Sequence, residues 1–204
     1  MTAAQTRRSP KQERSQRRVE QILDATRGLV GRRGNDAVSM REIAAEAGVS
    51  VSSVYQYFPD KNALLRAIIE RYLDEIRGEI MGVLATVRTF DDLIAAVAQL
   101  IDRLWAMFQR EPELAAVWSG IQANATLRAF DMKDTRDIAE AFAALAGTLM
   151  PSADEDEVFD VALYIAHVAF FALRIAYHAS DEDAASLLRE QKRMIVLRLR
   201  SLVG

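Results

Sequence analysis

The sequence predicts an all-α fold, and three observations support this. Apolar residues recur at intervals of three and four along most of the 204 residues, which is the spacing of one helix face. The four prolines, Pro10, Pro59, Pro112 and Pro151, fall between these patterns, where a missing backbone N–H does least harm. Half of the residues are apolar and 27% are charged, as is usual for a globular chain.

The first helix is expected over residues 14–33, where Val19, Ile22 and Val30 lie on one apolar stripe. Gly34 suits a left-handed cap at its end. Residues 1–18, which overlap the start of this helix, are expected to be a flexible arm that carries many positive charges. These are Arg7, Arg8, Lys11, Arg14, Arg17 and Arg18.

Two short helices are expected next, at residues 40–47 and 51–57. Ser39 and Glu42 have the spacing of a capping box, in which each side chain bonds the backbone N–H of the other. Ser50 suits the cap of the second short helix, and Pro59 ends it because the residue before a proline is pushed out of the α region.

A long helix is expected to begin near Asp60 and to continue past Ile80. Five further helices are expected at residues 90–110, 112–123, 126–149, 154–178 and 181–202. The apolar stretch Val158–Tyr177 is interrupted by Asp160, His167 and Arg174, so it is interpreted as a buried helix and not as a membrane span.

Composition excludes several kinds of site. The chain has no Cys and two His, which excludes disulfide scaffolds, thiolate zinc sites and cysteine nucleophiles. We expect no metal, no cofactor and no catalytic residues. The acidic clusters, such as Asp131, Asp134 and Asp137, are interpreted as solvated faces. With a polar N-terminus and no disulfides, a cytoplasmic protein is expected.

Charge is divided unevenly along the chain. Residues 1–66 carry a net charge of +5 and residues 67–204 carry −8. The positive charge of residues 1–66, beside a negative remainder, favours a polyanionic partner for this N-terminal part. The alternative is a basic tail that is merely solvated.

The two short helices, joined by a turn that contains Gly48, have the spacing of a helix-turn-helix. Five apolar residues can hold these two helices at a steep angle against the first helix. They are Ile43, Ala47, Val49, Val54 and Phe58. The second helix then presents small and polar residues outward, which allows close approach to base edges in a major groove. An ordinary helical hairpin whose Ser and Tyr face solvent remains the alternative.

The run from Ile22 to Leu65, with VSMREIAAEAGVSVSSVYQYFPDKNALL, resembles the DNA-binding segment of the TetR family of transcriptional regulators. Its most specific part is AGVS followed three residues later by VYQYFPDK. The chain departs from the family at Asn35-Asp36, where an aromatic residue is frequent.

The resemblance implies a homodimer with a helix-turn-helix DNA-binding domain at residues 14–60 and a helical ligand-binding and dimerisation domain at 61–204. The DNA-contacting positions of the family match Ser39, Arg41, Val51, Ser52, Ser53, Tyr55, Gln56, Tyr57 and Lys61. Among these, Lys61 is expected to contact phosphate and Gln56 to contact bases.

Residues 158–177 and the last helix fit a subunit interface, since both carry apolar residues at helical spacing. Apolar and polar side chains of the body could line a ligand cavity, with plain core packing as the alternative. The candidates are Trp105, Phe108, Trp118, Phe142, Tyr164, His167, Phe171 and Arg174.

The sequence therefore favours a ligand-responsive regulator, most simply a repressor that a small apolar effector releases from a pseudo-palindromic operator. Two alternatives stay open: an all-α enzyme or ligand carrier, and a ligand-independent activator with the same DNA-binding domain. The effector, the operator and the regulated genes are not encoded in any recognisable pattern.

Overall fold

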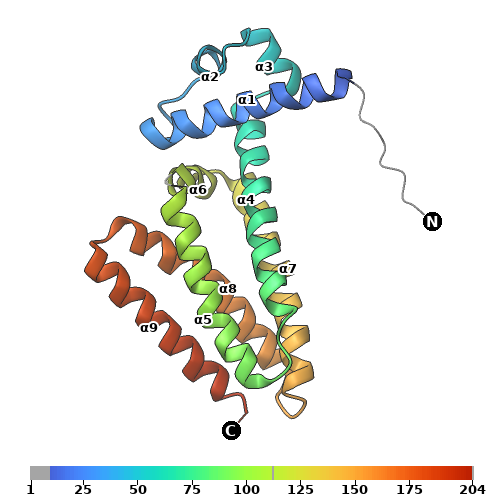
Figure 1. The fold of residues 1–204 in the computed structure, drawn as a ribbon, viewed down its shortest axis with the longest axis vertical. Helices are drawn as coiled ribbons and strands as arrows, with labels where there is room; N and C mark the ends of the chain where they lie inside the picture. The colour runs from blue at the N-terminus through green and yellow to red at the C-terminus, as the bar shows by residue number, and fades with distance from the viewer. Residues whose placement is uncertain (1–9, 112, 204) are drawn as a thin grey trace, which may run out of the picture.

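The computed structural model describes residues 10–111 and 113–203, and these form α-helices joined by short turns. A small head of three helices lies at one end of an elongated helical body, and α4 runs from one into the other (Figure 1). The helix bounds are α1 Pro10–Arg33, α2 Met40–Glu46, α3 Val51–Tyr57, α4 Lys61–Leu84, α5 Phe90–Arg110, α6 Glu113–Ala123, α7 Ala125–Leu149, α8 Glu155–His178 and α9 Asp181–Arg200. The predicted all-α fold is confirmed.

The first helix is longer than the sequence pattern predicted. It begins at Pro10, and not at Arg14, because proline is well suited to the first turn of a helix, where its missing N–H is not needed. Much of the segment expected to be a flexible arm is therefore helical. Residues 1–9, which include Arg7 and Arg8, lie outside the described residues.

The predicted caps are confirmed. Ser39 and Glu42 form the capping box of α2, and the Ser50 side chain accepts from the backbone N–H of Ser53 at the start of α3. Gly34 and Gly48 have φ angles of 77° and 65°, which lie in the left-handed region that favours glycine. These two glycines make the turns that position α2 and α3.

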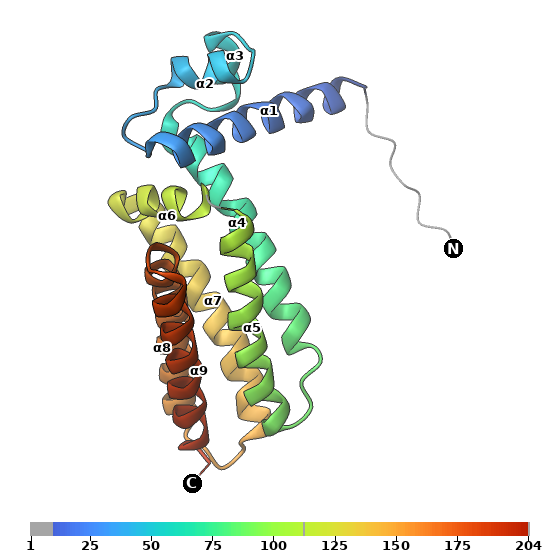
Figure 2. The same cartoon turned by 60° about the vertical axis from the view of Figure 1, so that its left-hand side comes forward.

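The short helix α6 lies between the head and the body. Figures 1 and 2 both show it beneath α1, crossing the end of the longer body helices. Its inner side is buried through Leu114, Val117 and Ile121. Because α6 packs against α1, α4 and α7, it joins the head to the body in addition to α4.

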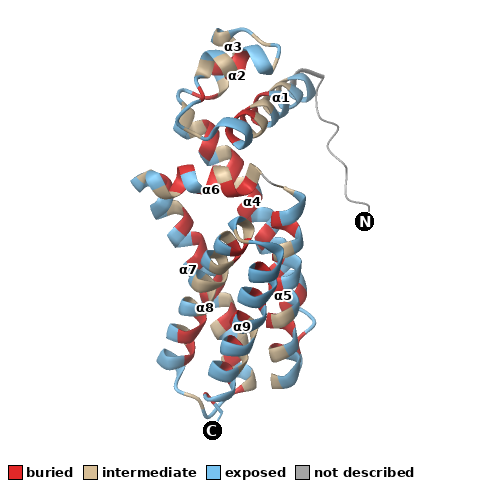
Figure 3. Ribbon diagram, turned by 90° about the vertical axis from the view of Figure 1, so that its left-hand side faces the viewer, coloured by how far each residue is buried: buried red, intermediate tan, exposed pale blue. Residues whose placement is uncertain are grey.

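The apolar helix α8 is less buried than the sequence predicted. By length and composition alone α8 could cross a membrane. Of its most apolar 18-residue stretch, 22% is buried inside the subunit. Tyr164, Phe171 and Ile175 are exposed along it, and Figure 3 shows blue and tan residues over the outer sides of α8 and α9. Complete burial within one subunit, the alternative to the expected subunit interface, is therefore not seen, because α8 packs through one side against α7 and α9 and leaves the other side open.

Candidate nucleic-acid interface and ligand cavity

The α2–α3 unit is held as a rigid wedge by the head's own core. Ile43, Val54 and Phe58 are buried, and Ala47 and Val49 pack against them. The backbone N–H of Val49 donates to the carbonyl of Ala44 at 2.9 Å, which closes the turn after α2. The five apolar residues predicted to hold α2 and α3 therefore pack together as expected. They fix α3 at the outer end of the molecule (Figure 1).

The outward face of α3 consists of Ser52, Tyr55 and Gln56. All three are exposed, and their spacing of three and four residues places them on one side of the helix. Tyr55 is 51% exposed, which is a large exposed fraction for an aromatic residue. Val51 and Ser53 are half-buried on the flank. This face has the size and polarity of a helix that enters a major groove.

Other predicted contact residues are engaged within the head. The Ser39 hydroxyl donates to Glu42 Oε2 at 2.7 Å, so it serves chiefly as a cap. The Tyr57 hydroxyl accepts from Ser15 Oγ at 3.3 Å, which ties α3 to α1. Arg41, by contrast, is exposed and has no hydrogen bond or ion pair with the described residues, so its guanidinium can reach a phosphate or a base.

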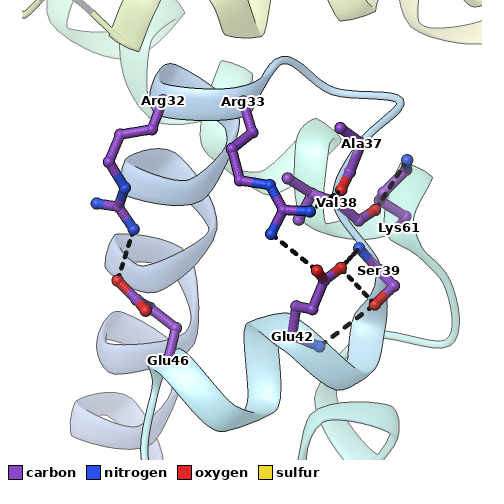
Figure 4. Close-up of polar contacts among 8 residues, drawn as sticks. All are labelled: Arg32, Arg33, Ala37, Val38, Ser39, Glu42, Glu46 and Lys61. Carbon is purple, nitrogen blue, oxygen red and sulfur yellow. Dashed lines mark hydrogen bonds and ion pairs between the residues drawn. The ribbon is translucent and has the colours of Figure 1, made fainter.

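The structure gives Lys61 a role that the sequence did not indicate. Its Nζ donates to the carbonyl of Asn35 at 2.8 Å. It also donates to the carbonyl of Val38 at 3.2 Å, as Figure 4 shows. Two of its three N–H groups are therefore used to hold the turn between α1 and α2. A stripe pattern could not reveal this contact, since it joins residues more than 20 positions apart.

Charge around the start of α2 is balanced by a compact network (Figure 4). Arg33 Nη1 donates to Glu42 Oε1 at 2.8 Å, and the other Glu42 oxygen accepts from the N–H and hydroxyl of Ser39. The Ser39 hydroxyl, followed by the Arg33 guanidinium, lowers the pKa of Glu42 to about 2. A charged Glu42 is thus part of the folded head at any physiological pH.

The N-terminal half of α1 adds positive charge beside α3. Arg14 and Arg17 are exposed and Arg18 is half-buried, on the same stretch whose Ser15 contacts Tyr57. These arginines lie where the predicted arm and the predicted first helix overlap, and the structure places them in the helix. The basic charge predicted for the head therefore lies next to the proposed reading helix.

A cavity of about 390 Å³ lies between α6, α7 and α8 in the body. It brings together four of the eight predicted ligand residues, namely Trp118, His167, Phe171 and Arg174. The other four lie elsewhere. Phe108 is buried core, Trp105 packs against the core, Phe142 lines a separate apolar cavity of about 70 Å³, and Tyr164 is 62% exposed on α8.

Four polar residues of this cavity were not among the predicted ones: Gln122, Arg128, Asp131 and Thr135. Asp131 and Asp134 were expected on a solvated face, which is wrong, because α7 is covered on several sides by α4, α6 and α8. Asp134 pairs with Arg77 of α4. Asp131 accepts from Gln122 Nε2 at 3.0 Å, and burial raises the pKa of its carboxyl group.

Comparison with known sequences matches both parts of the chain to one family. Residues 22–68 match the description "Bacterial regulatory proteins, tetR family", and residues 91–203 match "Tetracyclin repressor-like, C-terminal domain". The chain is 31% identical over 108 residues to the transcriptional regulator BetI of Rhizobium meliloti, covering 53% of this chain and 52% of that protein. It is 42% identical over 59 residues to the repressor KstR of Rhodococcus jostii, covering 29% and 28%.

The aligned segments thus span about half or less of these curated relatives. A solved TetR-family regulator from Streptomyces coelicolor has a similar fold, with a TM-score of 0.70 and 21% identity over 93% of this chain and 99% of that one. The two matched regions coincide with the head and with most of the helical body described above.

Proposed function

Since this chain belongs to the TetR family of bacterial regulatory proteins, we propose that it is a ligand-responsive, DNA-binding transcriptional regulator and not an enzyme. We assign it to the cytoplasm, where chromosomal DNA is accessible. The observation that carries the proposal is the outward face of α3, where Ser52, Tyr55 and Gln56 are exposed on a rigid helix. Arg41 and the arginines of α1 supply positive charge on either side, which suits phosphate contacts.

A homodimer accounts for the open apolar surface of the body. Exposed apolar residues gather on α8 and α9: Tyr164, Phe171, Ile175, Leu187, Met194 and Leu197. A contiguous apolar surface of this kind marks an interaction site in a soluble protein. A second copy presents the same two helices, so a two-fold interface would cover both surfaces at once. Such a dimer would place its two α3 helices on half-sites about 34–36 Å apart.

Helix α6 is positioned to transmit ligand binding to the head. Its Trp118 and Gln122 line the cavity, and its Gly120 faces the head so closely that a Cβ there would lie 3.1 Å from the Cβ of Asn35. Asn35 is also held by Lys61 at the start of α4. A shift of α6 on ligand binding would therefore displace the turn before α2. The two α3 helices would then no longer match the half-site spacing.

Selection of bound sequences from random duplex DNA tests the proposal. We expect the full-length protein to enrich a pseudo-palindrome and its affinity to fall steeply as salt is raised, because phosphate contacts release counterions. Gln56→Ala should change the enriched sequence, and Arg41→Ala should weaken binding. Recovery of unselected DNA, or of single half-sites alone, would contradict the proposal.

The direction of regulation requires a separate measurement. We propose repression, as in the relative named a repressor, KstR. A reporter fused to the enriched operator should be expressed more strongly when the gene for this protein is deleted. Lower expression in the deletion strain would identify an activator instead.

A further inference from the structure

We propose that the cavity between α6, α7 and α8 binds an aromatic carboxylate that carries a hydrogen-bond donor at its far end. The inference rests on the proposed function, since it names the chemical class of the effector. It is argued from the charges, the aromatic walls and the one buried carboxylate of the cavity.

Two guanidinium groups of the cavity form no close ion pair, although the charge of Arg174 acts on Asp131. Arg128 and Arg174 both line the cavity, and neither forms an ion pair with the described residues. Arg128 donates one N–H to the carbonyl of Gln122 at 2.7 Å, which leaves its other N–H groups available. Arg174 is half-buried with its guanidinium 6.0 Å from the centre of the Phe171 ring. A planar guanidinium of this kind can bind a carboxylate through two parallel hydrogen bonds.

The walls of the cavity suit a flat ring. Trp118 and Phe170 stack with their centroids 5.7 Å apart and their planes at 9°, and Phe171 and Met132 add further apolar surface. A volume of about 390 Å³ lies in the range of small-molecule sites and exceeds that of a single aromatic ring. The cavity is therefore lined by aromatic and apolar surface as well as by charged groups.

Asp131 provides an acceptor inside the same cavity. The residue is 9% exposed, its Oδ2 accepts from Gln122, and its Oδ1 accepts no hydrogen bond from the described residues. This oxygen is not fully buried, so a hydroxyl or amine donor on a ligand in the cavity can bind it.

The balance of charge decides between an anionic and a cationic ligand. Aromatic rings beside a carboxylate would also suit a cation. Here, however, two guanidiniums and one carboxylate line the cavity, so their formal charges sum to +1 even with Asp131 ionised. An anionic ligand is therefore favoured over a cationic one.

Binding can be measured without DNA, so the result is independent of whether the protein is a regulator. Trp118 and Trp105 are the two tryptophans of the chain, and Trp105 does not line this cavity. In full-length Trp105→Phe protein, the emission of Trp118 should change on addition of para-hydroxybenzoate. The neutral para-hydroxybenzamide should bind at least about tenfold more weakly, since it lacks the charge that a guanidinium recognises. Benzyltrimethylammonium, a cation of similar size, should not bind.

Substitutions locate the site. Arg174→Gln should weaken binding of para-hydroxybenzoate by at least about tenfold, and the more exposed Arg128→Gln should also weaken it. Arg189→Gln is the matched control, because Arg189 is exposed on α9 and does not line the cavity. Equal binding of the amide, preferred binding of the cation, no binding of the carboxylate, or no effect of both cavity variants would overturn the proposal. Loss of DNA binding in a selection assay would instead contradict the proposed function and leave this result unaffected.

Discussion

At the scale of single residues, Lys61 stabilises the head from within. We expect Lys61→Ala to lower the free energy of unfolding by about 1–3 kcal/mol, because two partly buried carbonyls would lose their donor. Chemical denaturation measures the free energy of unfolding. Lys133→Ala is the control, since Lys133 is exposed and pairs only with Asp137 on the same helix, and it should change stability by less than about 0.5 kcal/mol. Equal effects of the two variants would show that the Lys61 contacts contribute nothing.

Glu42 gives the head a defined response to acid. Its pKa is lowered to about 2 from an ordinary value near 4.5, so the unfolded chain binds the proton more readily than the folded one. Its contribution is therefore complete above pH 4.5 and is lost as the pH falls towards 2. The protection of the α2 amides from hydrogen exchange, relative to the rate of unstructured amides at the same pH, should decrease over that window. In Glu42→Gln, this part of the pH dependence should be absent, and an unchanged profile would exclude the carboxylate as its source.

Sequence patterns predicted local features of single residues well and long-range ones poorly. The caps at Ser39 and Ser50 depend on residues three positions away, and a reader of the sequence has those residues in view. Lys61 and Asp131 depend on neighbours brought in by other helices. Because charged residues are usually solvated, the sequence pattern favoured a solvated face for Asp131, which is wrong, and did not indicate the contacts of Lys61 within the head.

At the scale of helices, α6 is the element that contacts both the cavity and the head. We expect Gly120→Ala to strain this contact, because the new Cβ would lie 3.1 Å from Asn35. Overpacking of this kind costs about 1–3 kcal/mol, which exceeds the gain of about 1 kcal/mol in helix propensity. Thermal unfolding of the variant should therefore occur at a lower temperature, and DNA affinity should change without any substitution in the head.

Gly78→Ala is the matched control for this prediction. Gly78 lies inside α4, and nothing lies within 4 Å of a Cβ built there. The alanine should therefore raise the melting temperature through helix propensity alone. If Gly120→Ala stabilises the protein as Gly78→Ala does, α6 is not tightly packed against the head.

Helix bounds were predictable from the same local signals, with the body helices agreeing to within two residues. The start of α1 was not, because the positive charge of residues 7–18 favoured an arm, whereas Pro10 is itself a good first residue of a helix. Only four of the eight candidate ligand residues line the cavity between α6, α7 and α8. Aromatic residues at helical spacing look alike whether they fill the core, as Phe108 does, or line a cavity, as Trp118 does.

At the scale of the whole molecule, the open side of α8 and α9 predicts the oligomeric state. We expect Met194→Glu to convert the dimer to a monomer, because the substitution places a charge in the proposed apolar interface. Light scattering during size-exclusion chromatography measures the mass. Met81→Glu is the control, since Met81 is also exposed but lies on α4, and it should leave the dimer intact. A dimeric Met194→Glu protein would place the interface elsewhere.

The incomplete burial of α8 also has a consequence for how the chain matures. If its apolar side is covered only when two chains meet, docking contributes to the stability of each chain, and the apparent melting temperature should rise with protein concentration. A newly synthesised subunit that has not yet dimerised would expose this apolar side, which makes the chain prone to aggregation and proteolysis. Cells making little of this protein would then hold a smaller intact fraction of it, so the abundance of the regulator would itself depend on how fast it is produced.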